Sequence, residues 1–261
     1  MSTRKTVVAG SFYPNEKDEL LDLFKSFSKN KNYKSNFKNI QAIITPHSGY
    51  IYSGKLSDIS YSLCSLQNPK RVVVIGPSHN TLFKGSSVCL DDEYETPLGN
   101  IKIDLEFSQF LLNKYDFLST NEECAFEHST ETQAPFIKYY FPKAKMIEIV
   151  YGNQDFNSLS NLIDDIFSND ENLLIISTDL SHFHSLEIAN QLDVNCIKAI
   201  EKKDISLLED CEACGKVGIK AVLKSALKKS LESKVLDYST SYDINNDKSK
   251  VVGYTTALIG K

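Results

Sequence analysis

RVVVI at residues 71–75 is the stretch that decides the fold, because it is the strongest strand signal in the chain. Four β-branched residues in a row favour a strand that is buried on both faces, and Gly76-Pro77 ends it. QAIIT at 41–45 and LLIIS at 173–177 are similar runs elsewhere in the chain. Buried strands that alternate with helical patterns predict a sheet covered by helices.

The rest of the chain alternates between helical and strand patterns. Asn15 is a plausible N-cap, and the residues after it show helical spacing. Further helices are expected at 54–65, 106–114, 129–140, 156–167, 185–200, 205–208 and 216–228, and further strands beside the turn at 97–100 and at 145–150, 235–241 and 251–259. No repeat or long linker divides the sequence. We therefore predict one α/β domain over residues 1–261, with a central mixed sheet flanked by helices.

Composition narrows the class of protein. The 261 residues are 41% hydrophobic and 24% charged, with a net charge of −5. The basic residues are scattered, which argues against nucleic acid as the main partner. The N-terminal stretch MSTRKTVVAGSFYP does not resemble a signal peptide, and no apolar run approaches the roughly 18 residues of a membrane span. We therefore expect a cytoplasmic protein, and we expect its six cysteines to be reduced thiols.

Side chains that can do chemistry follow the three apolar strands. His47 follows QAIITP, His79 follows RVVVIGPS, and Asp179 and His182 follow LLIIS. In open α/β sheets the loops after the carboxyl ends of the strands share one edge, where ligands bind. A single loop histidine is more often structural, but four of the five histidines, with His128 in EHSTE as the fourth, lie in such polar turns. This clustering favours a shared site, and we expect the fifth histidine, His184, on the surface.

Cys214 adds a thiol where helical periodicity begins in DCEACGKVGIKAVL. The N-terminus of a helix should lower its pKa and make it a better nucleophile or metal ligand. With Cys211 it forms C-x-x-C, which suggests a redox dithiol or half of a zinc site. A structural zinc module is not expected, because no second ligand pair of that kind is present. The other cysteines are expected to be small buried hydrophobes: Cys64, Cys89, Cys124 and Cys196.

Eight motifs, in order, resemble those of the Memo family over nearly the whole length. They are AGSFYP at 9–14, TPHSGYIYSG at 45–54, GPSH at 76–79, EHSTETQAPF at 127–136, STDLSHF at 177–183, EACG at 212–215, DYSTSYD at 237–243 and VVGYTTA at 251–257. The resemblance implies a fold similar to class III extradiol dioxygenases, which bind Fe(II) through two histidines and a carboxylate. TPHSGYIYSG is specific on its own, and all eight blocks in register make chance agreement improbable.

The resemblance also implies roles for individual residues. His47 and His79 match the two histidine ligands, and Cys214 stands where the dioxygenases have the carboxylate. His182 matches the acid/base histidine, His128 a second pocket histidine, and Asp179 belongs to the same pocket motif. A His₂Cys set is softer than the dioxygenase set and suits iron or copper, with zinc a third candidate. A thiolate can also be oxidised, so ring cleavage is not transferred to this chain.

Three functions stay open, and with them the question whether the protein is an enzyme. The first is a redox metalloprotein that uses His182 to move protons. The second is a non-catalytic module that binds a peptide or small ligand, with Tyr13, Tyr50, Tyr52 and Ser53 as cleft or packing residues. The third is a hydrolase with Cys214 as nucleophile, His182 as base and Asp179 as orienter. Protein partners also stay open, and the residues identify no substrate.

Overall fold

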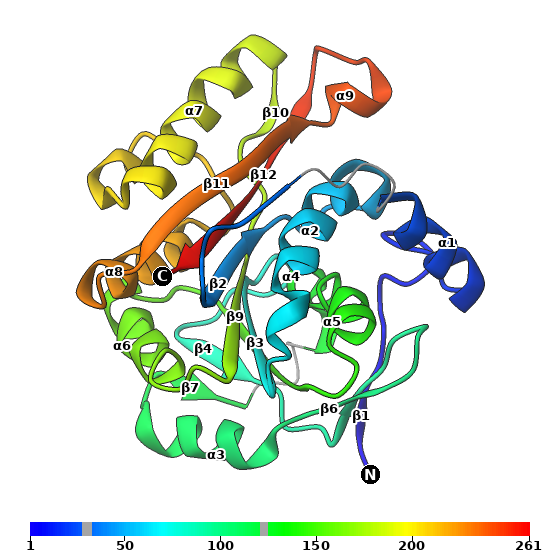
Figure 1. Ribbon diagram of the computed structural model, residues 1–261, viewed down its shortest axis with the longest axis vertical. Coiled ribbons are helices and arrows are strands. Elements are labelled where there is room, and N and C mark those ends of the chain that lie inside the picture. The colour runs from blue at the N-terminus through cyan, green and yellow to red at the C-terminus, as the bar shows by residue number, and fades with distance from the viewer. Residues whose placement is uncertain (28–32, 121–124) are drawn as a thin grey trace.

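Four parallel strands form the centre of the main sheet in a computed structural model that describes residues 1–27, 33–120 and 125–261. In spatial order they are β2 (Ile40–Thr45), β9 (Asn172–Ser177), β3 (Arg71–Pro77) and β8 (Lys145–Tyr151). Val72 of β3 lies opposite Leu173 of β9 and Met146 of β8. The parallel order directs the carboxyl ends of all four strands to one edge, which positions the site (Figure 1).

Antiparallel strands extend the sheet on both sides, so the sheet is mixed, as predicted. Beyond β2 lies β12 (Val251–Gly260), which pairs with β11 (Glu232–Thr240) and β10 (His182–His184). Beyond β8 lies β4 (Ser86–Val88), which pairs with β7 (Leu118–Ser119). A separate small sheet contains β1 (Thr3–Arg4), β5 (Glu93–Tyr94) and β6 (Ile101–Lys102).

Helices cover both faces of this sheet, and most side chains of the central strands are apolar, with Glu148 of β8 among the exceptions. Along β3, Val73 and Ile75 pack into one core while Val72 and Val74 pack into the other. The first core is closed by α3 (Leu105–Lys114), α6 (Phe156–Ile166), α7 (Leu186–Lys202) and α8 (Lys216–Lys228). The second is closed by α1 (Lys17–Phe27), α2 (Tyr50–Cys64) and α5 (Ala134–Tyr140). Burial on both faces explains why the RVVVI run does not alternate with polar residues.

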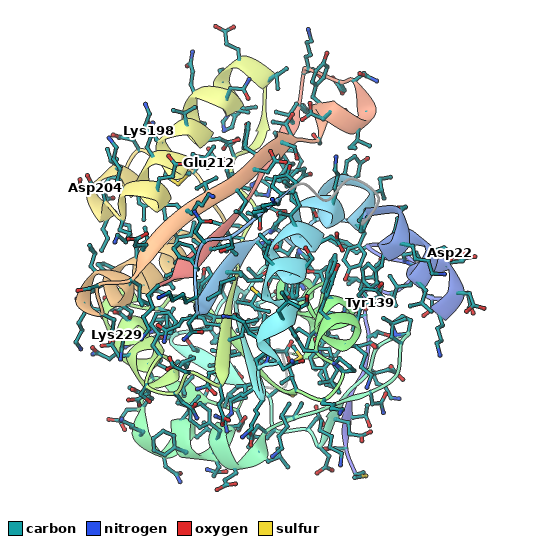
Figure 2. The ribbon with its side chains drawn as sticks, viewed as in Figure 1. Asp22, Tyr139, Lys198, Asp204, Glu212 and Lys229 are labelled. Carbon is teal, nitrogen blue, oxygen red and sulfur yellow. A yellow bond between two sulfur atoms is a disulfide. The ribbon has the colours of Figure 1, made fainter. Side chains whose placement is uncertain are left out.

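Many charged side chains lie outside these layers, although Arg4, Glu131 and Glu148 are buried. Figure 2 shows Asp22, Lys198, Asp204 and Lys229 at the periphery, on or beside the outer helices. Two short helices, α4 (His128–Glu131) and α9 (Tyr242–Asn245), complete the elements named in Figure 1. Within the described residues, no helix is both long and apolar enough to cross a membrane.

The predicted elements agree with the structure except at a few places. The helix expected from residue 54 begins at Tyr50. The single helix expected over 129–140 is two pieces, α4 and α5, because Pro135 lies in the first turn of α5, where its missing N–H does no harm. Residues 205–208 form a 3-10 helix rather than an α-helix. Short strands such as β4 and β10 were not predicted, since two or three residues carry too little periodicity.

Candidate metal centre

The carboxyl edge of the parallel strands brings three of the predicted residues to one place. His47, His79 and Asp179 each lie two residues beyond the end of their strand, β2, β3 and β9 respectively. These strands are adjacent in the sheet, in the order β2, β9, β3. Residues that are 132 positions apart in sequence, His47 and Asp179, therefore share a hydrogen bond.

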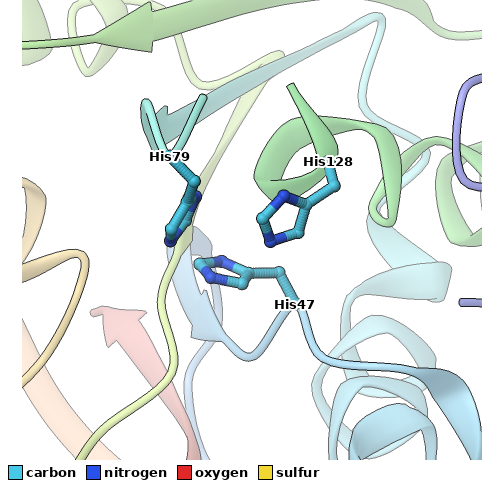
Figure 3. Close-up of side chains that lie close together, drawn as sticks. All are labelled: His47, His79 and His128. Atoms are coloured by element: carbon cyan, nitrogen blue, oxygen red, sulfur yellow. The ribbon is translucent and has the colours of Figure 1, made fainter. Parts of the chain in front are cut away.

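A cluster of three histidines lies at this edge, and His128 at the start of α4 is its third member (Figure 3). The ring centroid of His79 lies 5.1 Å from that of His47 and 4.4 Å from that of His128. One ligand nitrogen from each ring lies within 4.8 Å of the others. His47 is buried, whereas the other two are partly accessible. The three histidines can therefore hold a metal ion.

The hydrogen bonds of His47 decide which of its nitrogens is free. Ser177 Oγ donates its only proton to the carbonyl oxygen of Ser129 at 2.5 Å, and it accepts from the amide of Gln133 at 3.0 Å. Ser177 must therefore accept a proton from His47 Nδ1, 3.1 Å away. His47 Nε2 is left with its lone pair. Burial, and then the neighbouring histidines, lower the pKa of His47 to about 4 although Asp179 opposes them, so the ring is neutral near pH 7.

One carboxylate contacts the other two histidines. Glu127 Oε1 lies 2.9 Å from Nδ1 of His79 and 3.2 Å from Nδ1 of His128. Burial by itself would raise the pKa of Glu127, but the hydrogen bonds it accepts from His79 and from the Ser129 N–H hold it at about 2. The Nδ1 atoms of both rings thus face a carboxylate, and Nε2 is the nitrogen left for a ligand.

Cys214 reaches the cluster through His47. Its Sγ lies 3.3 Å from His47 Nε2 and accepts the backbone N–H of Asp179 at 3.2 Å. The next residue, Gly215, allows this approach, because a Cβ there would lie 2.4 Å from Cβ of Thr178. The sulfur is not one of the three ligand atoms that lie within 4.8 Å of one another. The structure places Cys214 beside His47, at the side of the histidine cluster.

The expected low pKa of Cys214 is wrong. The thiol lies just before α8, as predicted, but burial and the neighbouring Asp179 carboxylate raise its pKa to about 12. Removal from water destabilises the thiolate more than the helix N-terminus stabilises it. A free Cys214 is therefore protonated, which does not suit the hydrolase hypothesis. Its imidazole partner is also His47 rather than His182.

The expectation of reduced thiols is wrong for one pair of cysteines. Cys196 of α7 forms a disulfide with Cys211, so Cys211 and Cys214 are neither a dithiol nor half of a zinc site. The sequence spacing suggested the nearer partner, but packing of α7 against the turn at Cys211 favours the farther one. Cys64 and Cys89 are free and buried, as predicted. Cys124 lies outside the described residues.

The remaining predicted residues differ in how close they lie to the cluster. Asp179 is buried, accepts from the His47 N–H and the Ser48 hydroxyl, and has Oδ2 3.9 Å from His47 Nε2. His182 lies on β10, partly exposed, with its backbone N–H donated to Glu212 and its ring against Phe183. His184 is also partly exposed and pairs with Glu212 through Nε2 at 2.8 Å, near the surface as expected.

The aromatic residues proposed for a cleft are packing residues in two cases. Tyr13 and Tyr50 are buried and lie in contact with each other. The Tyr13 hydroxyl donates to Glu131, and the Tyr50 hydroxyl donates to the carbonyl oxygen of Thr132. Neither side chain is available to a ligand. Ser53 is buried too, and it closes the turn before α2 by donating to the carbonyl of Ser48.

Comparison with known proteins shows the family of this chain. Residues 4–258 match the family model of Memo-like proteins. The chain belongs to the Memo family. A MEMO1 family protein of Methanobrevibacter smithii is 34% identical over 282 residues, which cover 98% of this chain and 99% of that relative. A MEMO1 family protein of Aquifex aeolicus is 33% identical over 269 residues, which cover 97% of this chain and 98% of that relative.

Family membership confirms the resemblance seen in the eight motifs. A third Memo family relative, from Nitrosopumilus maritimus, is 31% identical over 268 residues, which cover 96% of this chain and 97% of the relative. The α/β fold with its central mixed sheet is the Memo fold. The likeness to extradiol dioxygenases stays a prediction.

Glu127, Ser177 and Gln133 are site residues that the sequence did not assign. Each contacts a histidine of the cluster or the residue that orients one. Two of them stand inside the EHSTETQAPF motif and the third begins STDLSHF, so the motifs marked the right segments. Their roles depend on contacts across more than 40 residues, which a single sequence does not show.

Proposed function

We propose that this Memo family protein is a redox-active metalloprotein that holds iron or copper at His47, His79 and Cys214. The observation that carries the proposal is the convergence of histidine rings at one edge of the sheet, with Cys214 Sγ 3.3 Å from His47 Nε2. The Nδ1 atoms of the three clustered rings all face protein oxygens, which leaves Nε2 as the donor in each. His128 is the competing third ligand.

The donor set fits such an ion. Imidazole suits zinc, copper and iron, and a thiol adds the softness that favours copper over magnesium or calcium. By the usual order of affinity copper binds such ligands more tightly than iron or zinc, so availability in the cell decides among them. Iron or copper bound there would supply one-electron redox chemistry. Zinc would supply none and is the third candidate.

Three side chains are proposed to hold or move protons beside the ligands. Asp179 can take a proton at Oδ2, which lies 3.9 Å from His47 Nε2. If Cys214 is the third metal ligand, His128 is proposed to hold or move a proton, because its ring adjoins the rings of His47 and His79. His182 is proposed from its position on the segment after β9, at the accessible side. A small molecule or peptide is the expected ligand, and a cytoplasmic location stays a prediction.

Metal content is the direct test. The protein would be purified with and without air, and its iron, copper and zinc would be measured by elemental analysis. We expect about one ion per chain, lost in His47→Ala and kept in the control His184→Ala, which removes a histidine that pairs with Glu212. A wild-type protein that neither retains nor takes up any of the three ions would overturn the proposal.

A second candidate function is a non-catalytic site for a peptide or small ligand with an aromatic group. Two exposed aromatic side chains favour it: Phe126, 63% exposed and next to Glu127, and Phe183, 70% exposed and next to His182. Phe183 also has a φ of +62°, a conformation that bulky residues rarely adopt. Binding of such a ligand to metal-free protein with unchanged affinity would favour this function over the first.

A further inference from the structure

We propose that Glu127 is a positioning residue that fixes the proton on Nδ1 of His79, and more weakly on Nδ1 of His128, so that both rings present an unprotonated Nε2 to the same point. The inference rests on the proposed function, since it explains how the ligand set is prepared. Glu127 occupies no ligand position itself and acts through the two histidines.

The four contacts of the Glu127 carboxylate carry the inference. Oε2 accepts the backbone N–H of His79 at 2.6 Å, and Oε1 accepts the backbone N–H of Ser129 at 2.9 Å. These backbone groups can only donate, so both oxygens act as acceptors. Oε1 also lies 2.9 Å from Nδ1 of His79 and 3.2 Å from Nδ1 of His128. An acceptor at that place requires a ring proton on Nδ1, and in the neutral ring this leaves Nε2 with its lone pair.

The two rings do not depend on Glu127 equally. The contact with His79 is a hydrogen bond. A second hydrogen bond, from the His79 backbone N–H, holds the Glu127 carboxylate beside the ring. The contact with His128 is longer and is an ion-pair distance only. We therefore expect the tautomer of His79 to depend strongly on Glu127 and that of His128 less so.

The main chain of Glu127 is anchored by a buried arginine. Arg4 Nη2 donates to the Glu127 carbonyl oxygen at 2.7 Å, and Nη1 donates to Glu131 Oε2 at 2.5 Å. Both Arg4 and Glu131 are fully buried, and Glu131 also accepts the backbone N–H groups of Val7 and Val8. The N-terminal segment thus holds α4 and its preceding residue against the sheet. The carboxylate is thereby positioned before any ligand arrives.

His47 provides a control within the same site. Its Nδ1 faces Ser177 Oγ, and no contact between the Glu127 and His47 side chains is found among the hydrogen bonds and ion pairs of the described residues. Loss of the Glu127 carboxylate should therefore change His79, change His128 less, and leave the tautomer of His47 as it is. A general loosening of the site would change all three rings together.

The experiment uses metal-free protein with ¹⁵N-labelled histidine, whose two ring nitrogens are distinguished by NMR. In the wild type we expect His79 to carry its proton on Nδ1. In Glu127→Gln we expect a substantial shift of His79 toward the other tautomer, because an amide has one oxygen and cannot accept both the His79 backbone N–H at the Oε2 position and the ring N–H at the Oε1 position. Asp104→Asn is the matched control, since Asp104 is a buried carboxyl that accepts from Arg71 and not from a histidine.

Two results would overturn the inference. One is a wild-type protein in which His79 carries its proton on Nε2. This result does not depend on the folding of any variant. The other is a Glu127→Gln protein with unchanged histidine tautomers. A titration with Zn²⁺ follows, in which we expect Glu127→Gln to bind roughly 10- to 100-fold more weakly than Asp104→Asn. Failure of the wild type to bind metal would count against the proposed function alone, because the tautomers are measured without metal.

Discussion

Cys214 Sγ lies 3.3 Å from Nε2 of His47, although 167 residues separate the two in sequence. The ring proton of His47 is on Nδ1, bound to Ser177, so Nε2 is an acceptor that faces the Cys214 thiol, which also lies 3.5 Å from the carbonyl oxygen of Asp179. Both groups are neutral in this arrangement, in agreement with the raised pKa of Cys214 and the lowered pKa of His47. Under the proposed function, a metal cation would take the place of the thiol proton.

Cys214→Ser should weaken Cu(I) binding by more than roughly tenfold and Fe(II) binding less, because a neutral hydroxyl is a poor replacement for a soft thiolate. Anaerobic titration of each variant with each ion measures this. His128→Gln is the comparison variant, since His128 competes as third ligand. If His128→Gln loses more affinity than Cys214→Ser, the three histidines are the ligand set and the cysteine is not a ligand.

His182→Ala should leave most metal binding intact while changing any redox activity. The reason is position: the His182 ring contacts Phe183, and its backbone is held by Glu212, so it lies outside the group of three ligand nitrogens. Metal content and redox activity would be measured on the same preparation. A loss of metal as large as in His47→Ala would make His182 a ligand.

Stability of the metal-free protein should fall as the pH drops from about 6.5 to about 4. The pKa of His47 is 6.5 when unfolded and about 4 when folded, so the unfolded chain binds the extra proton in that window. The contribution of His47 to the free energy of unfolding is complete above pH 6.5 and is lost as the pH falls to about 4. It is on the order of 3 kcal/mol. Urea unfolding at several pH values measures it. His47→Gln should flatten the slope, and an unchanged slope would contradict the assignment.

A second window is expected at lower pH from Glu127. Its pKa falls from 4.5 in the unfolded chain to about 2 in the fold, so its contribution is present above 4.5 and is lost as the pH falls through 2. Comparison of the wild type with Glu127→Gln between pH 5 and pH 3 isolates it. The two windows barely overlap, so each variant should remove its own part of the pH dependence.

Gly215→Ala should destabilise the fold by about 1–3 kcal/mol and displace Cys214. A methyl group there would lie 2.6 Å from Thr178 Oγ1 and 2.8 Å from the carbonyl oxygen of Ser177, and the latter is backbone that cannot move alone. Gly49→Ala is the control on the neighbouring loop, where the nearest atom is 3.6 Å away. Chemical unfolding of both variants measures the difference, and equal stabilities would show that the close approach is not required.

Cys196→Ser should lower stability by about 3 kcal/mol, because the disulfide to Cys211 closes a segment with a sequence separation of 15. Unfolding with and without a strong reductant tests this, since reduction should bring the wild type to the level of the variant. Cys64→Ser is the comparison for loss of a buried sulfur without a crosslink. A wild type that is equally stable after verified reduction would argue against a stabilising disulfide.

The sequence by itself determined the layered fold and its functional edge. Val72 to Ile75, with the similar runs in β2 and β9, could only be strands covered on both faces, and turn residues directly after them fixed where each strand ends. His47, His79 and Asp179 stood at the same offset after those strands. Parallel strands share an edge, so local pattern was enough to predict that the three lie near one another.

The tertiary structure alone decided the contacts and the charge states. His128 joins the cluster because α4 packs against β3, where Ser129 Oγ donates to the carbonyl oxygen of Pro77. The Cys211 partner is Cys196 and not Cys214, since packing brings α7 to that turn. Burial, which depends on everything around a group, raised the pKa of Cys214 where the helix N-terminus predicted the opposite. Proton positions follow from these long-range neighbours, and no periodicity in the chain encodes them.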